Sequence, residues 1–369
     1  MPFSSVLSSS YKNTSYSQET STATFTATST GNSLQESITN AFNTFINNNL
    51  NNSNITENIL SLDITTNSMP QFRKIIENLN MPPCVIFDNS NNLYITTDGY
   101  PNKLLKYNEN YMLEEFVSDE AWLYGPNNNL PKTPVSMAFN KDFTYMYVVN
   151  FTHNSITVIK MSDYTYQTLQ LTPTDISNVG KKGYRLNGPN GLTFDSTYSY
   201  MIATNIEDSN LVKITINQYS PNMAIISPFN ENVPFTQPIL ITNDNTLPNN
   251  NFYVSDLSQS IVYKVNDASY SEFEGPTYIF QPRGVSFNTN YYNKLWVTNS
   301  TNEPNTTIEY PIVSVDVETS SIVNILINPL FNNPRGVLFD KDNYMYICNF
   351  GTIGNNGDGS ILKSINPFI

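Results

Sequence analysis

Short runs of apolar and aromatic residues, bounded by Asn, Asp or Gly, recur along most of the chain. Typical examples are LYITT at 93–97, SITVIK at 155–160 and LWVTN at 295–299. Runs of this length, rich in β-branched and aromatic residues and flanked by turn formers, are typical of β-strands. The i, i+3, i+4 spacing of an amphipathic helix is absent from this region. The pattern therefore predicts an all-β fold.

A six-residue phrase that begins with Pro and ends with Phe precedes these runs. It recurs at 82–87, 134–139, 189–194, 282–287 and 334–339, and a degenerate copy at 238–243 has Asn243 in place of the Phe. From Phe87 to Phe339 there are 252 residues and five intervals, about 50 residues per unit. Each unit holds four strand-like runs, and four strands in 40–50 residues are typical of a propeller blade. The sequence predicts six blades.

The two ends of the repeated region predict how the ring closes. After Phe339 only 30 residues remain, about one strand fewer than a blade requires. FRKIIEN at 72–78 stands before the first phrase as SIVNILI at 321–327 stands before the last. We expect 72–78 to pair with the last blade, because this removes an open sheet edge. The predicted propeller spans residues 70–369.

The repeated unit, Pro-x-Gly-Val-x-Phe-Asp followed by a strand that ends in Asn or Asp, resembles the NHL repeat. It is also similar to the six-bladed propellers of the lactonase and lyase type. The resemblance covers the last 300 residues and implies the fold. It says little about activity, because propellers carry out many unrelated functions.

Residues 1–69 form a different region, a Ser/Thr/Asn-rich, low-complexity N-terminal extension. Within it, Ser33 and Glu36 have the spacing of a capping box, and the segment 33–50 then places apolar residues on one helical face. We expect a short helix there. It would either pack against the propeller or serve as an oligomerisation or docking arm.

The charge of the chain narrows the classes of partner. The net charge is −13, whereas nucleic-acid binding needs clustered Lys and Arg, so no nucleic-acid partner is expected. No apolar run approaches the length of a membrane span, and the first residues lack the pattern of a signal peptide. The compartment stays open. Cys84 and Cys348 do not form a disulfide framework and are expected to be packed core thiols.

The few cations are predicted to gather on one face. In a propeller, the loops that enter the first strand and the loops between the second and third strands emerge on the same side, which we call the top face. This side receives Arg283 and Arg335, which follow the Pro of two adjacent phrases, and also Arg185, Lys181, Lys182 and His153. We expect the top face to bind an anionic small ligand or an acidic protein. Alternatively, Arg283 and Arg335 only bond carbonyls or carboxylates at the rim.

Other sequence features give weaker indications of a functional site. Trp122, in a long loop of the top face, could anchor a partner or fold back over the blades.

An Asx residue ends the second strand in five blades. It could contribute to a calcium site, but its repetition favours a structural role in turning the chain. No nucleophile, zinc or phosphate-loop motif is present, so we expect no cofactor, no metal and a non-catalytic binding or scaffold protein. The alternative is a metal-dependent or metal-free hydrolase or lyase with His153 as the base and the two arginines as anion clamps.

Overall fold

The computed structural model describes residues 71–98, 103–114, 133–217, 219–244, 250–273, 278–288, 294–300, 309–353, 355 and 357–368, and three strands nearer the N-terminus. The chain divides into two compact units, Met1–Gln71 and Phe72–Ile369. In the first unit, β1 (Phe3–Ser9), β2 (Ala27–Gly31) and β3 (Leu62–Thr65) form an antiparallel sheet in the order β2-β1-β3. The helix expected at 33–50 lies outside the described residues.

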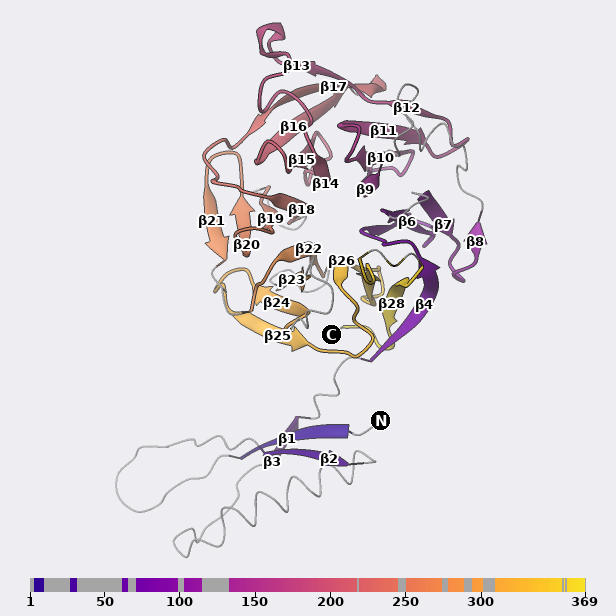
Figure 1. Ribbon diagram of the computed structural model, residues 1–369, viewed down its shortest axis with the longest axis vertical. Coiled ribbons are helices and arrows are strands. Elements are labelled where there is room, and N and C mark those ends of the chain that lie inside the picture. Colours follow the sequence, from indigo (N-terminus) through magenta and orange to yellow (C-terminus); the bar gives the residue numbers. More distant parts are fainter. Residues whose placement is uncertain are drawn as a thin grey trace, which may run out of the picture. The chain divides into compact units, whose positions relative to one another are not determined.

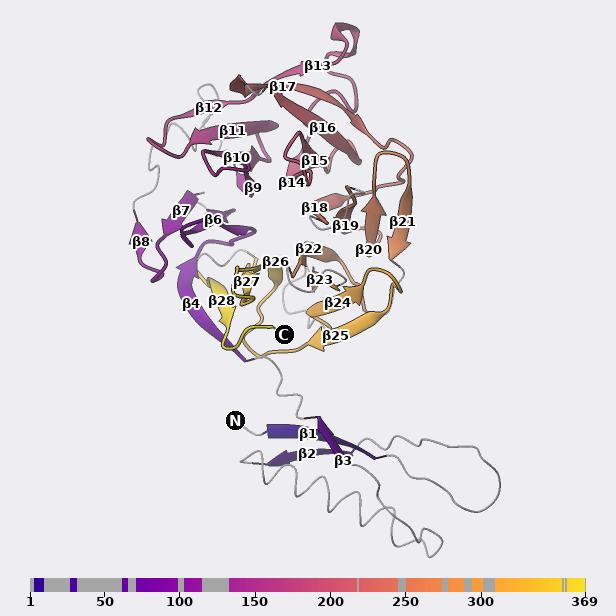
Figure 2. The same cartoon turned by 180° about the vertical axis from the view of Figure 1, so that it is seen from behind.

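The second unit is a ring of six sheets around a central axis (Figures 1 and 2), which confirms the predicted all-β, six-bladed propeller. From the axis outwards, blade 1 holds β5 (Val85–Phe87), β6 (Leu93–Thr97), β7 (Lys103–Tyr107) and β8 (Leu113–Glu114); blade 2 holds β9 (Pro134–Phe139), β10 (Tyr145–Asn150), β11 (Ser155–Lys160) and β12 (Tyr166–Thr168); blade 3 holds β14 (Pro189–Phe194), β15 (Met201–Asn205), β16 (Asn210–Asn217), β17 (Ser220–Phe229) and β13 (Gln170–Pro173).

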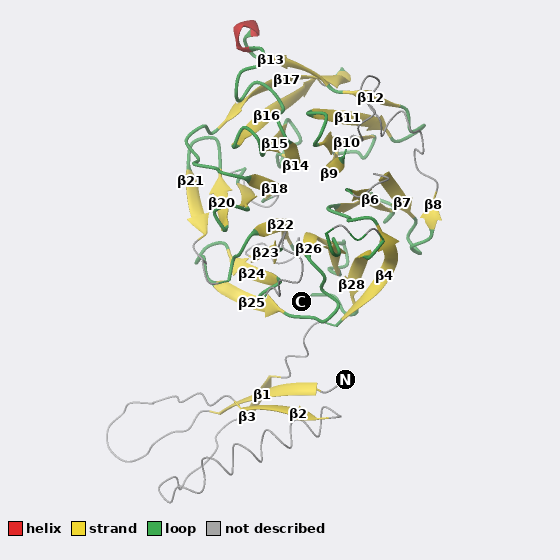
Figure 3. Ribbon diagram, in the orientation of Figure 1, coloured by secondary structure: helices red, strands yellow, loops and turns green. Residues whose placement is uncertain are grey.

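The other three blades follow the same order. Blade 4 holds β18 (Pro238–Asn243), β19 (Phe252–Asp256), β20 (Ile261–Val265) and β21 (Tyr270–Phe273); blade 5 holds β22 (Pro282–Phe287), β23 (Lys294–Asn299), β24 (Ile312–Asp316) and β25 (Ile322–Leu326); blade 6 holds β26 (Pro334–Phe339), β27 (Met345–Asn349), β28 (Gly359–Ser364) and β4 (Phe72–Leu79). The described part of the chain contains one helix, the 3₁₀ turn η1 (Ile176–Asn178; Figure 3), and hence no helix able to span a membrane.

The outermost strand of blade 6 comes from the start of this unit. β4 pairs antiparallel with β28, with Phe72 opposite Ser364 and Leu79 opposite Gly359. Its buried side chain Phe72 packs with blades 5 and 6, and its buried side chains Ile76 and Leu79 pack with blades 6 and 1. The pairing covers the edge that β28 would otherwise expose.

The Phe that ends the repeated phrase packs across the gap to the preceding blade. Its ring meets an aromatic side chain of that blade's second strand, mostly edge to face, a favoured aromatic geometry. The five pairs are Tyr94–Phe139, Tyr147–Phe194, Tyr253–Phe287, Trp296–Phe339 and Tyr346–Phe87. In blade 4 the phrase ends in Asn243, and the corresponding residue of blade 3 is Ile202 instead of an aromatic residue. The junction of blades 3 and 4 therefore has neither of the two aromatic residues of the pair.

The Gly of the phrase reflects a close approach between neighbouring blades. In blades 2 to 6 the inner strand carries an irregularity of register after its Pro; in blade 5, for example, Arg283 and Gly284 together face Thr298. A Cβ atom on Gly284 would lie 2.0 Å from the carbonyl oxygen of Arg335 in blade 6. Bulges of this kind redirect the chain, and here only glycine leaves room for the next blade.

A ring of hydroxyl groups bridges the blades at the same level. Thr96, Thr204, Ser255 and Thr298 each donate a hydrogen bond to the carbonyl of the second phrase residue in the next blade, at 2.6–2.9 Å. The Thr204 and Thr298 hydroxyls also accept the backbone N–H of Gly191 and Gly284. Each of these buried hydroxyls satisfies a backbone group that would otherwise be costly to bury.

Blade 3 departs from four strands. The run YQTLQL at 166–171, which is continuous in the sequence, is divided between two blades. β12 ends blade 2, whereas β13 pairs in parallel with β17 of blade 3, so that blade 3 has five strands. β17 has ten residues and is the longest strand described in the ring. β13 pairs with the outer edge of β17, so that this edge is not left open to pair with another chain.

The two cysteines provide a test of the packing. Cys348 is buried in β27, and Cys84, just before β5, is half-buried. Burial raises the pKa of Cys84 to about 11 and raises that of Cys348 well above its usual value. Since the thiolate is the reactive form, we expect both thiols to react with a maleimide or disulfide reagent only slowly in native buffer at pH 7–8, with Cys348 the slower. Mass spectrometry of the labelled protein over time measures this, and rapid modification of Cys348 before unfolding contradicts the packing.

Candidate functional site

Arg283, Arg335 and Asp98 meet at the top-face end of the axis, and we refer to them as the arginine site. The two arginines are the second residues of β22 and β26, so each lies in the irregularity of register that follows the Pro of its phrase. Asp98 follows β6, in the neighbouring blade 1. Arg283 is buried, with 8% of its surface exposed. The guanidinium of Arg335 lies over the ring of Phe350, its Cζ atom 3.2 Å from the ring centroid, a favourable stacking geometry for arginine.

The three charges act on one another in a buried setting. Burial raises the pKa of Asp98, and the nearby Arg335 and Arg283 oppose this rise. Burial lowers the pKa of Arg283 to about 10, an effect that Asp98 opposes. The pKa of Arg335 is also lowered, first by burial and then by repulsion from Arg283. Guanidinium groups stay protonated at neutral pH, so, among the residues that the structure describes, two cations lie near the carboxyl of Asp98.

This arrangement joins two of the predicted residues with one that sequence reasoning missed. Asp98 interacts electrostatically with both arginines, so the alternative in which the arginines pair with a carboxylate stays open. Two neighbouring guanidinium groups also suit a carboxylate or a phosphate, which arginine binds in a bidentate manner.

Arg185, by contrast, is held in an ion pair within blade 3. Its Nε and Nη2 atoms donate to the two carboxylate oxygens of Asp208, at 2.9 and 2.8 Å. Asn187 also donates to Asp208, and these contacts, with the hydrogen bond from Arg185 as the largest contribution, lower the pKa of Asp208. Arg185 therefore fixes the loop that enters β14, and it is separate from the arginine site.

The other predicted cations are spread around the ring. Lys181 and Lys182 are exposed in the loop after η1, and Lys181 donates to Asn178 of that turn. His153 lies in the turn between β10 and β11 of blade 2, which is opposite β22 of blade 5 and two blades away from β26 of blade 6 (Figure 1). The structure does not bring these residues together with Arg283 and Arg335. Trp122 lies outside the described residues.

The Asx residues at the ends of the second strands bond the backbone of the loops that enter the inner strands. Asn299, for example, donates to the carbonyls of Tyr278 and Tyr310 and accepts from the N–H of Phe280. Asp256 accepts from Thr236 and Gln237. These residues cap loops, as their repetition predicted. Among the residues that the structure describes, no cluster of three His, Cys, Asp or Glu side chains could hold a metal ion.

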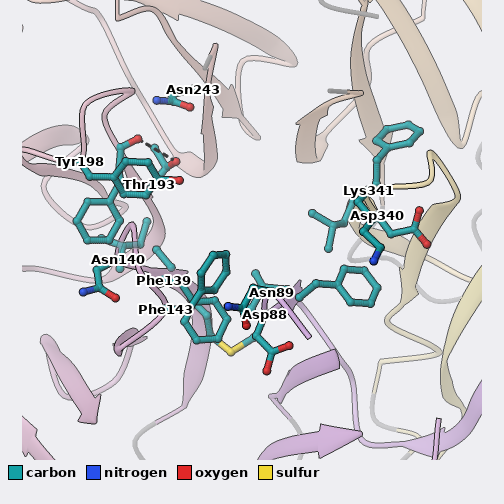
Figure 4. A pocket seen from close by; sticks show the side chains of 18 of the residues that line it. Asp88, Asn89, Phe139, Asn140, Phe143, Thr193, Tyr198, Asn243, Asp340 and Lys341 are labelled. Carbon is teal, nitrogen blue, oxygen red and sulfur yellow. Dashed lines mark hydrogen bonds between the residues drawn. The ribbon is translucent and has the colours of Figure 1, made fainter. Parts of the chain in front are cut away.

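A cavity of about 550 Å³ lies at the opposite end of the axis, where no site had been predicted. Its walls are the ends of five inner strands and the turns that follow them: blades 1, 2, 3, 4 and 6 contribute Asp88, Phe143, Tyr198, Asn243 and Lys341 among others (Figure 4). The sequence contained a signal for it, because Asn243 is the one phrase residue that replaces Phe. We refer to this feature as the aromatic cavity.

Comparisons with known proteins support the fold alone. No protein-family model matches the sequence, and no curated protein matches it. Among solved structures, a gluconolactonase from Xanthomonas campestris is 12% identical, with a TM-score of 0.55 over 80% of this chain and 89% of that protein. A streptogramin B lyase is 14% identical, with a TM-score of 0.51 and 82% of each chain covered. Virginiamycin B lyase from Staphylococcus aureus is 14% identical, with a TM-score of 0.50 over 79% and 99%.

Proposed function

We propose that this chain is a binding propeller that takes an anionic group, from a small ligand or an acidic protein, at the arginine site. The observation that carries the proposal is the neighbourhood of three charged groups: Arg283, which is buried, Arg335, which is half-buried, and the carboxyl of Asp98 in blade 1. A chain of net charge −13 places two of its few arginines there. Guanidinium groups bind carboxylates and phosphates through paired, charge-assisted hydrogen bonds, so an anion that contacts both arginines lowers the free energy of the site.

A lyase or hydrolase is the second candidate function, and Asp98 is the observation that favours it. A half-buried carboxyl with a raised pKa, beside groups that can stabilise an oxyanion, has the properties of a general acid or base. Proteins of similar fold include a lyase and a gluconolactonase. The version of this hypothesis with His153 as base has less support, because His153 lies in blade 2 and the arginines lie in blades 5 and 6. One-dimensional NMR of a bound anion over hours separates the two candidates, since only an enzyme produces new resonances.

The central test removes one guanidinium group at a time. In Arg283→Gln and in Arg335→Gln we expect the affinity for citrate or inorganic phosphate, measured by calorimetry, to fall at least tenfold. Each charged hydrogen bond contributes about 1.5–3 kcal/mol, which supports a loss of this size. The melting temperature should change little, because Asp98 keeps one of its two arginine neighbours.

Arg185→Gln is the matched control on the same face. It should lower the melting temperature, because Asp208 loses its partner, and it should leave anion affinity unchanged. If the Arg283 and Arg335 variants instead lose stability while binding phosphate and citrate as the wild type does, the two arginines only pair at the rim. If the wild type binds neither anion, nor any acidic peptide offered in its place, the proposed function is wrong.

A further inference from the structure

The turns that lead from the first strand of a blade to the second form part of the aromatic cavity. In blades 1, 2, 3 and 6 they are built alike: the carbonyl of an Asx residue accepts the N–H of the third residue after it, and the Asx side chain accepts a further backbone N–H. That third residue has a left-handed backbone, with φ between +58° and +65°. It is Asn91 in blade 1 and Asn343 in blade 6, whereas blade 2 has Phe143 and blade 3 has Tyr198.

An aromatic residue is costly at this position of the turn. Asn adopts the left-handed region readily, whereas a bulky side chain is uncommon there, and the strain must be offset by other interactions. In Tyr111 and Tyr164, which also have a positive φ, the hydroxyl hydrogen-bonds to a lysine of the neighbouring blade. Phe143 and Tyr198 instead stack on the Phe of their own phrase, with ring centroids 5.2 and 5.4 Å apart. Phe143 stays partly exposed and Tyr198 stays 41% exposed, so both present ring surface at the cavity.

The rest of the cavity wall offers accessible polar groups. Asn89 and Lys341 are exposed, and Asn140 and Thr193 are partly exposed. Figure 4 shows Thr193, Asn89 and Lys341 on different sides of the same open space. The two carboxylates of the wall already accept hydrogen bonds within their own turns. Amide, hydroxyl and ammonium groups together provide both donors and acceptors, and one ammonium group beside two carboxylates does not attract an anion.

We propose that the aromatic cavity binds an uncharged sugar of one or two pyranose rings. One face of such a ring carries mostly C–H groups, which pack on the electron-rich face of an aromatic side chain, whereas its hydroxyl groups donate and accept hydrogen bonds. Tyr198, the more exposed of the two rings, is the main platform, and the polar side chains of the wall bind the hydroxyl groups.

The composition and the size of the cavity both fit this ligand. Small-ligand sites combine apolar and aromatic walls, which supply contact area, with a few polar groups that fix orientation. The volume of about 550 Å³ is within the range of such sites. The site is independent of the arginine site, because it lies at the other end of the axis.

The first experiment offers four neutral disaccharides, maltose, cellobiose, lactose and chitobiose, to the full chain and measures binding by saturation-transfer NMR and titration. We expect at least one to bind with a Kd on the order of millimolar, as small ligands with few contacts do. Citrate, the probe for the arginine site, should not displace it. Benzyl alcohol tests the alternative ligand class. The proposal is overturned if no disaccharide binds, whether or not benzyl alcohol does.

Tyr198→Asn separates the ring from the turn, because it gives blade 3 the residue that blades 1 and 6 have at this position. Sugar binding should weaken about tenfold with the loss of an aromatic anchor. The melting temperature should stay equal or rise, because Asn accommodates the left-handed backbone. Tyr219→Asn, at a tyrosine 86% exposed between β16 and β17, is the matched control and should change neither. A lower melting temperature with unchanged sugar affinity would mean that the Tyr198 ring only stabilises its turn.

Thr193→Val tests the polar part of the site without changing its shape. The substitution removes one hydroxyl group at the cavity and keeps a β-branched side chain in β14. The affinity for the disaccharide should fall by about threefold to tenfold, the usual effect of one neutral hydrogen bond, and circular dichroism should show an unchanged fold. If Thr193→Val and Tyr198→Asn both bind the sugar as tightly as the wild type, the sugar lies elsewhere and the proposal is wrong.

Discussion

Removal of residues 72–79 is expected to yield a chain without a cooperative thermal transition. These residues are β4, which completes blade 6, and they bury Phe72, Ile76 and Leu79. Each large apolar side chain contributes about 1.5–3 kcal/mol on burial, and an ordinary domain has a total stability of about 5–15 kcal/mol. Losing three such side chains and the hydrogen bonds to β28 therefore removes most of the stability of the ring.

Calorimetry or circular dichroism against temperature measures this loss. Removal of residues 1–65 is the control, since those residues belong to the other compact unit and their loss leaves every blade complete. We expect the melting temperature of that shorter chain to stay within a few degrees of the full chain. A chain without 72–79 that melts as the full chain does would show that β4 is dispensable for closure.

Gly284→Ala is expected to be the most damaging single-residue change among those considered. Its Cβ atom would lie 2.0 Å from the Arg335 carbonyl oxygen and 2.7 Å from the Thr298 hydroxyl. Blades 5 and 6 must move apart, which breaks the hydrogen bond from Thr298 to Arg335 and strains the neighbouring packing. Substitutions with such close contacts cost about 3 kcal/mol or more. Urea unfolding followed by tyrosine and tryptophan fluorescence gives the change in the free energy of unfolding.

Gly180→Ala separates steric contact from backbone conformation. Gly180 has a φ of +76°, and no atom lies within 4 Å of its added Cβ. Its substitution should therefore cost only about 1 kcal/mol, the usual penalty for a side chain in the left-handed region. Equal losses in the two variants would mean that the close approach between blades 5 and 6 does not decide the effect.

The repeat carried most of the information about the fold. The phrase that ends in Phe marks the inner strand because that ring must reach the aromatic residue of the preceding blade, and the spacing of about 50 residues follows from four strands and their turns. The division of YQTLQL between β12 and β13 could not be predicted in this way. Strand runs specify extended structure, whereas the choice of blade depends on which sheet edge is free, and that is a property of the assembled ring.

The candidate site was predicted only in part. Arg283 and Arg335 were placed at the axis because the phrase fixes their position in the strand. Asp98 was missed, because its approach to them depends on the meeting of blade 1 with blade 6, far apart in sequence. Arg185 was grouped with them, but its ion pair with Asp208 joins two loops that no periodic pattern relates. The aromatic cavity escaped notice for a similar reason, although Asn243 was visible as an exception.

The ring of bridging hydroxyls is not uniform, because one junction between blades has a thiol in place of the hydroxyl. Four junctions between blades use a Thr or Ser of the second strand, and Ser136 accepts from Leu192 at the junction of blades 2 and 3. Between blades 6 and 1 the corresponding residue is Cys348, whose thiol is a weak donor. Asp98 and Arg335 stand on the two sides of that same junction. If the proposed anion binds there, it contacts blades on both sides of this junction, and ligand binding would then also resist opening of the ring through mass action.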